Sequence, residues 1–228
     1  MTKVPILIAR SIGVCLAICA IVLMLINPQP ENNLPEGFFT PIIAFEFIQT
    51  PAEVVQFFQV SHPENYIQGM LLGNWIDYGF MTLYSGLLAC IAVIILRING
   101  TKTMYLALLF CLTMLAGDAV ENYQIYRIIR LYPFEQVSMA DELHWLNVFT
   151  WLKWGAIAAT FLLFTPFFLS GKPFHKIIGL LCLSCFGLSI AALLQHGILN
   201  EIFALNVVVL FLCMIIFVFT FKQKSVRN

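Results

Sequence analysis

The chain has 228 residues, of which 61% are apolar and 11% are charged, with twelve basic and twelve acidic side chains. Soluble domains average about 45 to 50% apolar and about 25% charged residues, so this composition excludes an ordinary soluble globular protein. The expected surroundings are membrane lipids. No nucleic-acid partner is expected, and the sequence identifies no partner protein.

Six apolar runs are each long enough to cross a bilayer, which takes about 20 residues. None of them alternates apolar and polar residues with period two, which excludes the strands of an outer-membrane barrel. Backbone amides cannot stay unpaired in lipid, so the runs are predicted to be helices. The sequence therefore predicts an all-α fold, a six-helix transmembrane bundle that forms one integral membrane domain over residues 1–228. The predicted spans are 6–26, 76–96, 103–122, 145–169, 177–194 and 201–221.

The first run could also be a secretory signal, because basic residues such as Lys3 and Arg10 followed by an apolar stretch are typical of one. The run ends in Asn27 and Pro28 and offers no small-x-small cleavage site. We therefore expect this helix to be retained as a span.

Charge predicts the orientation, because cytoplasmic loops of membrane proteins are enriched in Lys and Arg. Nine of the twelve basic residues fall on one side of the six-span arrangement, where no acidic residue lies. Both termini are therefore predicted to be cytoplasmic. The nine basic residues are Lys3, Arg10, Arg97, Lys102, Lys172, Lys176, Lys222, Lys224 and Arg227.

Residues 27–75 form a long acidic segment, expected to be external and to act as a lid. Thr40-Pro41 and Thr50-Pro51, the second with Glu53 in a capping box, predict the starts of two short interfacial helices. Many phenylalanines in this segment suit helices that lie at the outer interface or cap the bundle. Either the segment only shields helix ends, or it is a gate whose Glu46 points into a site.

Ionisable residues inside a membrane are costly and mark functional or strongly paired positions. On the third predicted helix, Asp118, Glu121 and Asn122 share one face because they lie three and four residues apart. Counted from Lys102, Asp118 lies about 24 Å along the helix, which places it in the outer half of the bilayer. This helix is also expected to continue outward until Pro133 ends it.

Two further helices bring polar groups to a similar depth. Lys153 lies about 12 Å below the outer end of the fourth helix. Asp77 and Tyr84 lie seven residues apart on one face of the second helix. We expect Lys153 to contact Asp118, Glu121 or Asp77, because a charge alone in lipid costs several kcal/mol.

The predicted ligand-binding residues are therefore Glu46, Asp77, Tyr84, Asp118, Glu121, Asn122 and Lys153. They admit two interpretations. One is a buried ion-pair network that holds helices in register. The other is an outward-opening polar pocket that binds the headgroup of a lipid or another amphipathic molecule, with excess carboxylates that favour a cationic or proton-linked ligand. The fifth and sixth helices look like packing scaffold.

No metal site, cofactor or catalytic residue is predicted. No two histidines have the spacing of a helical metal or haem site. No Gly-x-Ser-x-Gly, Walker A or His-Glu-x-x-His motif occurs in the chain. Cys182 and Cys185 have C-x-x-C spacing inside an apolar helix, where packing is the better interpretation.

The pattern resembles a bacterial family of uncharacterised multi-pass membrane proteins over roughly residues 40–160. Its most specific element is the Asp-x-x-Glu-Asn motif on the third helix. The resemblance implies the bacterial inner membrane and the same polar residues, but no activity. The segments that carry it are Ala44-Phe45-Glu46-Phe47, Thr50-Pro51, Trp75-Ile76-Asp77 with Tyr84, Ala116 to Asn122, and Leu152-Lys153-Trp154.

The sequence thus predicts a multi-pass inner-membrane protein whose outer-leaflet site, on helices two to four, binds or processes a lipid-like ligand. One alternative is a proton-coupled transporter or channel component. Such a protein would need polar residues that continue to the cytoplasmic side, and the inner halves of these helices have almost none. A second alternative is a non-catalytic assembly factor for a membrane partner. Whether the protein is an enzyme stays open.

Overall fold

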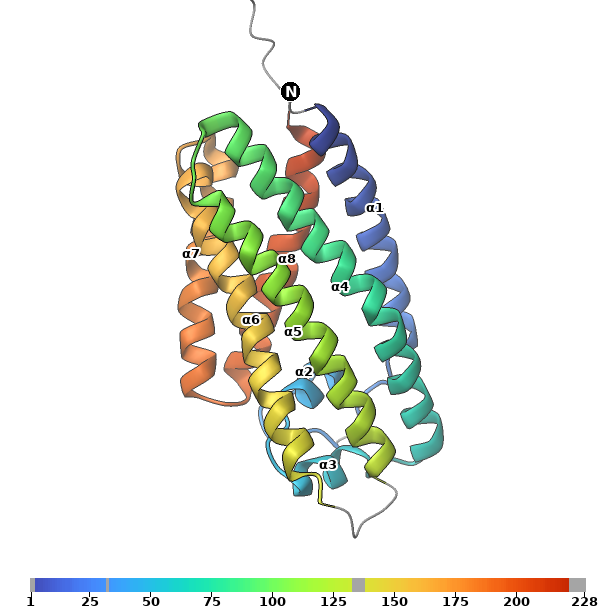
Figure 1. Ribbon diagram of the computed structural model, residues 1–228. Helices are drawn as coiled ribbons and strands as arrows, with labels where there is room; N and C mark the ends of the chain where they lie inside the picture. The colour runs from blue at the N-terminus through green and yellow to red at the C-terminus, as the bar shows by residue number, and fades with distance from the viewer. Residues whose placement is uncertain (1–2, 32, 133–137, 222–228) are drawn as a thin grey trace, which may run out of the picture.

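The computed structural model describes residues 3–31, 33–132 and 138–221. Within these ranges the fold is all-α, as predicted, and six helices have the length and composition to cross a membrane. They run side by side as one bundle (Figure 1). The helices are α1 (Lys3–Ile26), α2 (Pro41–Glu46), α3 (Pro51–Phe57), α4 (Pro63–Asn99), α5 (Met104–Leu131), α6 (Ala140–Leu169), α7 (Pro173–Leu194) and α8 (Ile198–Thr220).

Three of the long helices extend further than the apolar runs predict. α4 begins at Pro63 rather than near residue 76, α5 continues to Leu131, and α6 begins at Ala140. These extensions carry polar residues, so a search for apolar runs does not include them. Their backbones nevertheless continue the helical hydrogen bonding. The continuation of the third predicted helix past Arg130 is confirmed, while Pro133 lies outside the described residues.

The lid is shorter than predicted and comprises the described residues 27–31 and 33–62, because α4 begins at Pro63. Both short helices occur where the Thr-Pro pairs predict them. At α3, Thr50 and Glu53 form the predicted capping box. Five of the six phenylalanines of the lid are buried, while Phe39 is 57% exposed, so the lid caps the bundle. Its fully buried phenylalanines are Phe45, Phe47, Phe57 and Phe58.

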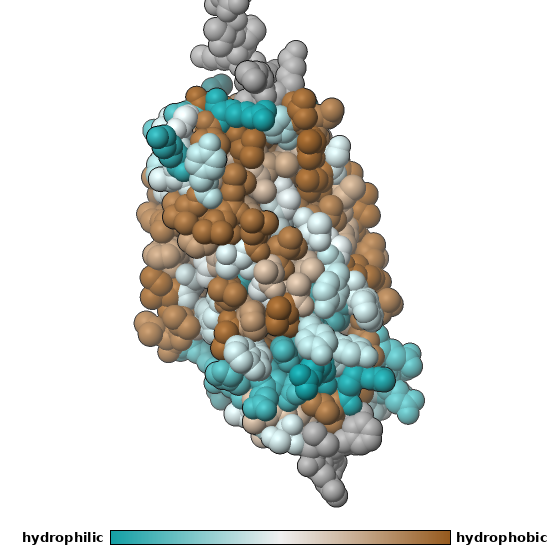
Figure 2. Space-filling model, viewed as in Figure 1, coloured by the Kyte–Doolittle hydropathy of each residue, from teal (hydrophilic) through white to brown (hydrophobic). Residues whose placement is uncertain are grey.

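The six long helices form a ring in the order α1, α4, α5, α6, α7, α8. The lid closes one end of this ring, the lower end in Figure 1, which we call the lid end. The other end, where α1 begins and α8 ends, is the termini end. The hydropathy of the visible face fits a membrane protein, since an apolar middle separates hydrophilic ends (Figure 2).

α1 packs along the length of α4 but touches α8 chiefly near the termini end. There, Arg10 Nε donates to the Val218 carbonyl at 2.8 Å, and a Cβ on Gly13 would lie 3.5 Å from Ile215. The contact between α1 and α8 is the thinnest in the ring. The two helices are thus in contact chiefly at the termini end. We call the gap between α1 and α8 toward the lid end the seam.

Candidate functional site

A buried lysine on α6 meets three carboxylates from two other elements. Lys153 Nζ lies 2.7 Å from Glu121 Oε2 and 3.5 Å from Asp118 Oδ1, both on α5, and 3.0 Å from Glu46 Oε2 on α2. None of these four side chains is more than 11% exposed. We call them the lysine cluster. Burial of an isolated charge costs free energy, so each charged group of the cluster is stabilised inside the bundle by its oppositely charged partners.

Neutral donors complete the lysine cluster. Trp154 Nε1 donates to Glu46 Oε2 at 2.8 Å, and Thr150 Oγ1 lies 3.1 Å from Glu121 Oε1. On the α4 side, the Tyr84 hydroxyl donates to Asp118 Oδ2 at 2.5 Å. Each carboxylate therefore has one neutral partner besides Lys153.

Gly117 lets the two helices that carry the lysine cluster come close together. A Cβ at this position would lie 3.1 Å from the backbone nitrogen of Lys153, which is tighter than ordinary packing allows. The residue before Asp118 is thus small enough for α5 to approach α6 at the depth of the cluster. This approach shortens the distance that the Lys153 side chain must span.

A second polar group lies nearer the lid, and we call it the amide cluster. Asn122 Nδ2 donates to Asp77 Oδ2 at 2.7 Å, and Asn74 Nδ2 donates to the Asn122 carbonyl at 3.0 Å. Asp77 is two helical turns, about 10 Å, closer to the lid end than Tyr84. Asn74 is 4% exposed, and its Oδ1 has no hydrogen-bond partner.

Both clusters border a cavity of about 600 Å³. Its inner wall carries the polar groups of α4, α5 and α6, among them Asn74, Asp77, Asp118 and Lys153. The rest of the lining is largely apolar and comes from the lid, α1 and α8. This size lies within the usual range for small-molecule sites, which are concave, mostly apolar and lined by few polar groups.

The cavity opens along the seam between α1 and α8. Its lining includes Met24 of α1 and Leu205 and Val208 of α8, which are all more than half exposed. These apolar side chains lie on the flank of the bundle, where a bilayer would surround them. Beyond Met24 the lining continues into the lid at Pro28 and Gln29. The opening therefore runs from an apolar flank to a more polar rim.

All seven predicted site residues lie in or next to these two clusters. Lys153 contacts Glu121 and Asp118 as expected, and also Glu46. No ion pair joins it to Asp77, whose partner is Asn122. Glu121 lies behind Lys153 and is fully buried, whereas the other six residues line the cavity.

Three contributions to the site are missing from the sequence-based prediction. Thr150 precedes Lys153 by three residues, and Asn74 precedes Asp77 by three, so helical spacing could have found both. The third is α8, predicted to be packing scaffold, which instead forms an apolar wall of the cavity. The polar residue in the middle of α8, Asn206, does not signal that role, because it donates to Ser184 of α7 and does not line the cavity.

Side chains of α6 and α8 bind the lid backbone and hold it over the cavity. Glu201 Oε1 accepts hydrogen bonds from the backbone amides of Phe39 and Thr40, at 3.0 and 2.7 Å, just before α2 begins. Asn147 Nδ2 donates to the Ile48 carbonyl at 2.8 Å, just after α2 ends. Glu46 on α2 is thereby held in the lysine cluster from both sides.

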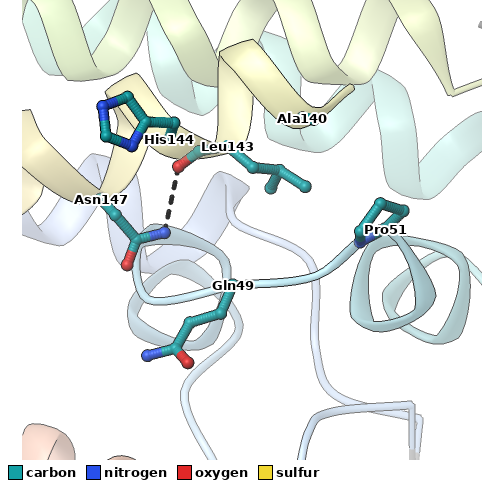
Figure 3. Close-up of a pocket in the computed structure, with 6 residues that line it drawn as sticks. All are labelled: Gln49, Pro51, Ala140, Leu143, His144 and Asn147. Atoms are coloured by element: carbon teal, nitrogen blue, oxygen red, sulfur yellow. Dashed lines mark hydrogen bonds between the residues drawn. The ribbon is translucent and has the colours of Figure 1, made fainter. Parts of the chain in front are cut away.

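A smaller hollow of about 380 Å³ lies between the lid and the start of α6 (Figure 3). Gln49, His144 and Asn147 line it, and Figure 3 shows Asn147 bonded to the Leu143 carbonyl of its own helix. Its polar groups lie at the surface, and none is a buried atom without a partner. The larger cavity is therefore the better candidate site.

No group of three or more His, Cys, Asp or Glu residues suited to a metal ion occurs in the part of the chain that the structure describes. No family model, curated protein or solved structure matches this chain. The resemblance to a family of bacterial multi-pass membrane proteins stays a prediction.

Proposed function

We propose that this multi-pass membrane protein binds or processes an amphipathic, lipid-like ligand that enters from the outer leaflet of the bacterial inner membrane. The observation that carries the proposal is the cavity: a polar inner wall, a lining that is otherwise largely apolar, and an opening on the flank of the bundle. A molecule with a polar head and an apolar tail matches this distribution. The head would lie at the two clusters and the tail along α1 and α8.

The orientation follows from the positive-inside rule, which puts the basic termini end in the cytoplasm and the lid outside. The same orientation puts the lysine cluster in the outer half of the membrane. Counted from the termini end, Asp118 and Lys153 lie about 21 and 24 Å along their helices, of the about 30 Å that a bilayer core spans.

A proton-coupled transporter or channel component is less well supported. Such a protein needs polar groups along a path to the other side. Between the lysine cluster and the termini end, the buried side chains in the described part of the bundle are mostly apolar. They include Leu88, Ile91, Met114, Phe161 and Phe164. A non-catalytic assembly factor has no specific observation in its favour.

Native mass spectrometry tests the proposal on protein extracted from its membrane in a mild non-ionic detergent. We expect one small amphipathic molecule to co-purify with each chain. Val208→Trp should reduce its occupancy several-fold, because the larger side chain fills the opening. Val209→Trp is the matched control, because Val209 is the next residue along α8 and does not line the cavity.

Two results would overturn the proposal. One is the absence of any co-purifying molecule from the wild-type protein and from both variants. The other is an equal occupancy in the Val208→Trp and Val209→Trp variants, which would place the bound molecule outside the cavity.

A further inference from the structure

The inner wall of the cavity offers unused acceptors but has few unused donors. The Lys153 ammonium is surrounded by three carboxylates, and the Tyr84 hydroxyl already donates to Asp118. Asn74 Oδ1, in contrast, is buried without a partner, and Asp77 accepts one hydrogen bond, from a neutral amide. A buried acceptor without a donor is destabilising, so a ligand that donates hydrogen bonds here supplies the missing partner for the acceptors of the inner wall.

Charge selects the same kind of ligand. The two clusters together hold four carboxyl groups, namely Glu46, Asp77, Asp118 and Glu121, and one amine, that of Lys153. Lys153 contacts three of these carboxyl groups, and no ion pair joins it to Asp77. A phosphate, sulfate or carboxylate head would add negative charge next to them. A cationic head would instead give Asp77 a charged partner.

The position of Asp77 also fits entry from the seam. It is half-buried, lies nearer the lid than Tyr84 and Asp118, and lines the same cavity as Leu205 and Val208. A head bound at Asp77 can thus leave its tail in the apolar part of the cavity, between α1 and α8. Among the described residues of α1 and α8 that line the cavity, only Glu201, near the lid, is charged, and the others are apolar.

On these grounds we infer that the ligand is a cationic amphiphile from the membrane: a protonated amine that donates hydrogen bonds to Asp77 and Asn74, with an alkyl or acyl tail between α1 and α8. This inference rests on the proposed function and specifies its ligand class. The ammonium head supplies donors for the unpaired oxygen of Asn74 and positive charge for Asp77. Lys153 keeps its three carboxylates when the ligand binds.

A series of probes with the same twelve-carbon tail tests the inference on the wild-type protein by native mass spectrometry. The heads are primary ammonium, trimethylammonium, hydroxyl and carboxylate. We expect dodecylammonium to bind one per chain, at least ten-fold tighter than dodecanol or dodecanoate. Dodecyltrimethylammonium should bind less tightly than dodecylammonium, because it has no N–H to donate. Methylammonium, which has the head without the tail, should not bind measurably.

Substitutions then locate the site. Asp77→Asn should weaken dodecylammonium binding at least ten-fold, while Asp141→Asn, at an exposed aspartate on α6, should leave it unchanged. If Asp77→Asn does not fold, Asn74→Ala takes its place, with a several-fold loss expected. Unchanged binding in the folded variant would overturn the inference.

The probe series separates the two proposals. Equal affinity for dodecanol or dodecanoate would refute the cationic head but leave an amphiphile site in place. Binding of methylammonium as tight as that of dodecylammonium would refute the membrane source. If no twelve-carbon probe binds and nothing co-purifies, the inference and the proposed function both fail.

Discussion

Lys153→Met perturbs the contact on which the buried lysine cluster depends. The substitution keeps most of the side-chain volume but leaves Glu46, Asp118 and Glu121 without their shared cation. Each carboxylate keeps only a neutral donor. Glu121 is affected most, because it is fully buried and has the shortest contact with Lys153, 2.7 Å.

The magnitude follows from these contacts. At an effective dielectric constant of about 20, a charge pair at 2.7 Å is worth about 6 kcal/mol before desolvation is subtracted. Removal of one partner from a buried ion pair typically costs about 3 to 5 kcal/mol. For a chain of this length, that loss corresponds to a fall in melting temperature of roughly 6 to 20 °C.

Thermal unfolding of the purified protein in detergent measures this fall. Lys176→Met is the matched control, because Lys176 is exposed on α7 and its loss should cost at most about 0.5 kcal/mol. The double variant Glu121→Gln/Lys153→Met should be more stable than the sum of the single effects, by about 1 to 3 kcal/mol. If Lys153→Met melts within about 2 °C of wild type, which corresponds to about 0.5 kcal/mol, the carboxylates do not depend on Lys153 for their stability in the bundle.

Three further predictions concern the lid and its supports. Glu201→Gln removes the charge from a carboxylate that accepts from two lid amides, so hydrogen exchange at those amides should become faster while exchange in the middle of the long helices stays unchanged. Gly197→Ala should destabilise the protein by more than 1 kcal/mol, since φ is +102° and a Cβ would lie 3.1 Å from a lid carbonyl; Gly187→Ala, with open space around it in α7, should instead stabilise by up to about 1 kcal/mol. Burial lowers the pKa of His196, between α7 and α8, below its usual 6.5, so the stability contributed by the neutral imidazole is present above pH 6.5 and is lost as the pH falls below that value. His196→Asn should therefore reduce the fall in melting temperature between pH 7.5 and pH 5.5. An equal fall in His196→Asn and in the control His62→Asn, at an exposed histidine, would contradict this assignment.

The number and type of helices were predictable because a bilayer imposes a length and an apolar composition on each span. The ends of the helices were harder to predict. α4 begins thirteen residues before its predicted start, in a stretch that contains Glu64 and Asn65. Polar residues there do not mark a loop, because a helix that rises above the membrane is free to carry them.

The candidate site was predictable where a buried charge needs a partner. Spacing along α5 placed Asp118 and Glu121 on one face, and the cost of an unpaired Lys153 in lipid predicted that they would meet. The approach of Glu46 from the lid was only one of two interpretations, because no local pattern determines how a connecting segment packs. The apolar wall from α8 was missed because apolar residues facing a cavity have the same composition as those facing lipid.

On the proposed function, an amphipathic molecule occupies the cavity and enters between α1 and α8. A crystal structure of the protein grown from a lipid phase tests it most directly. We expect elongated density whose polar end lies within hydrogen-bond distance of Asp77 or Asn74 and whose tail passes between Met24 and Val208. A cavity that holds only water, or one that α1 and α8 close by packing against each other along their whole length, would contradict it.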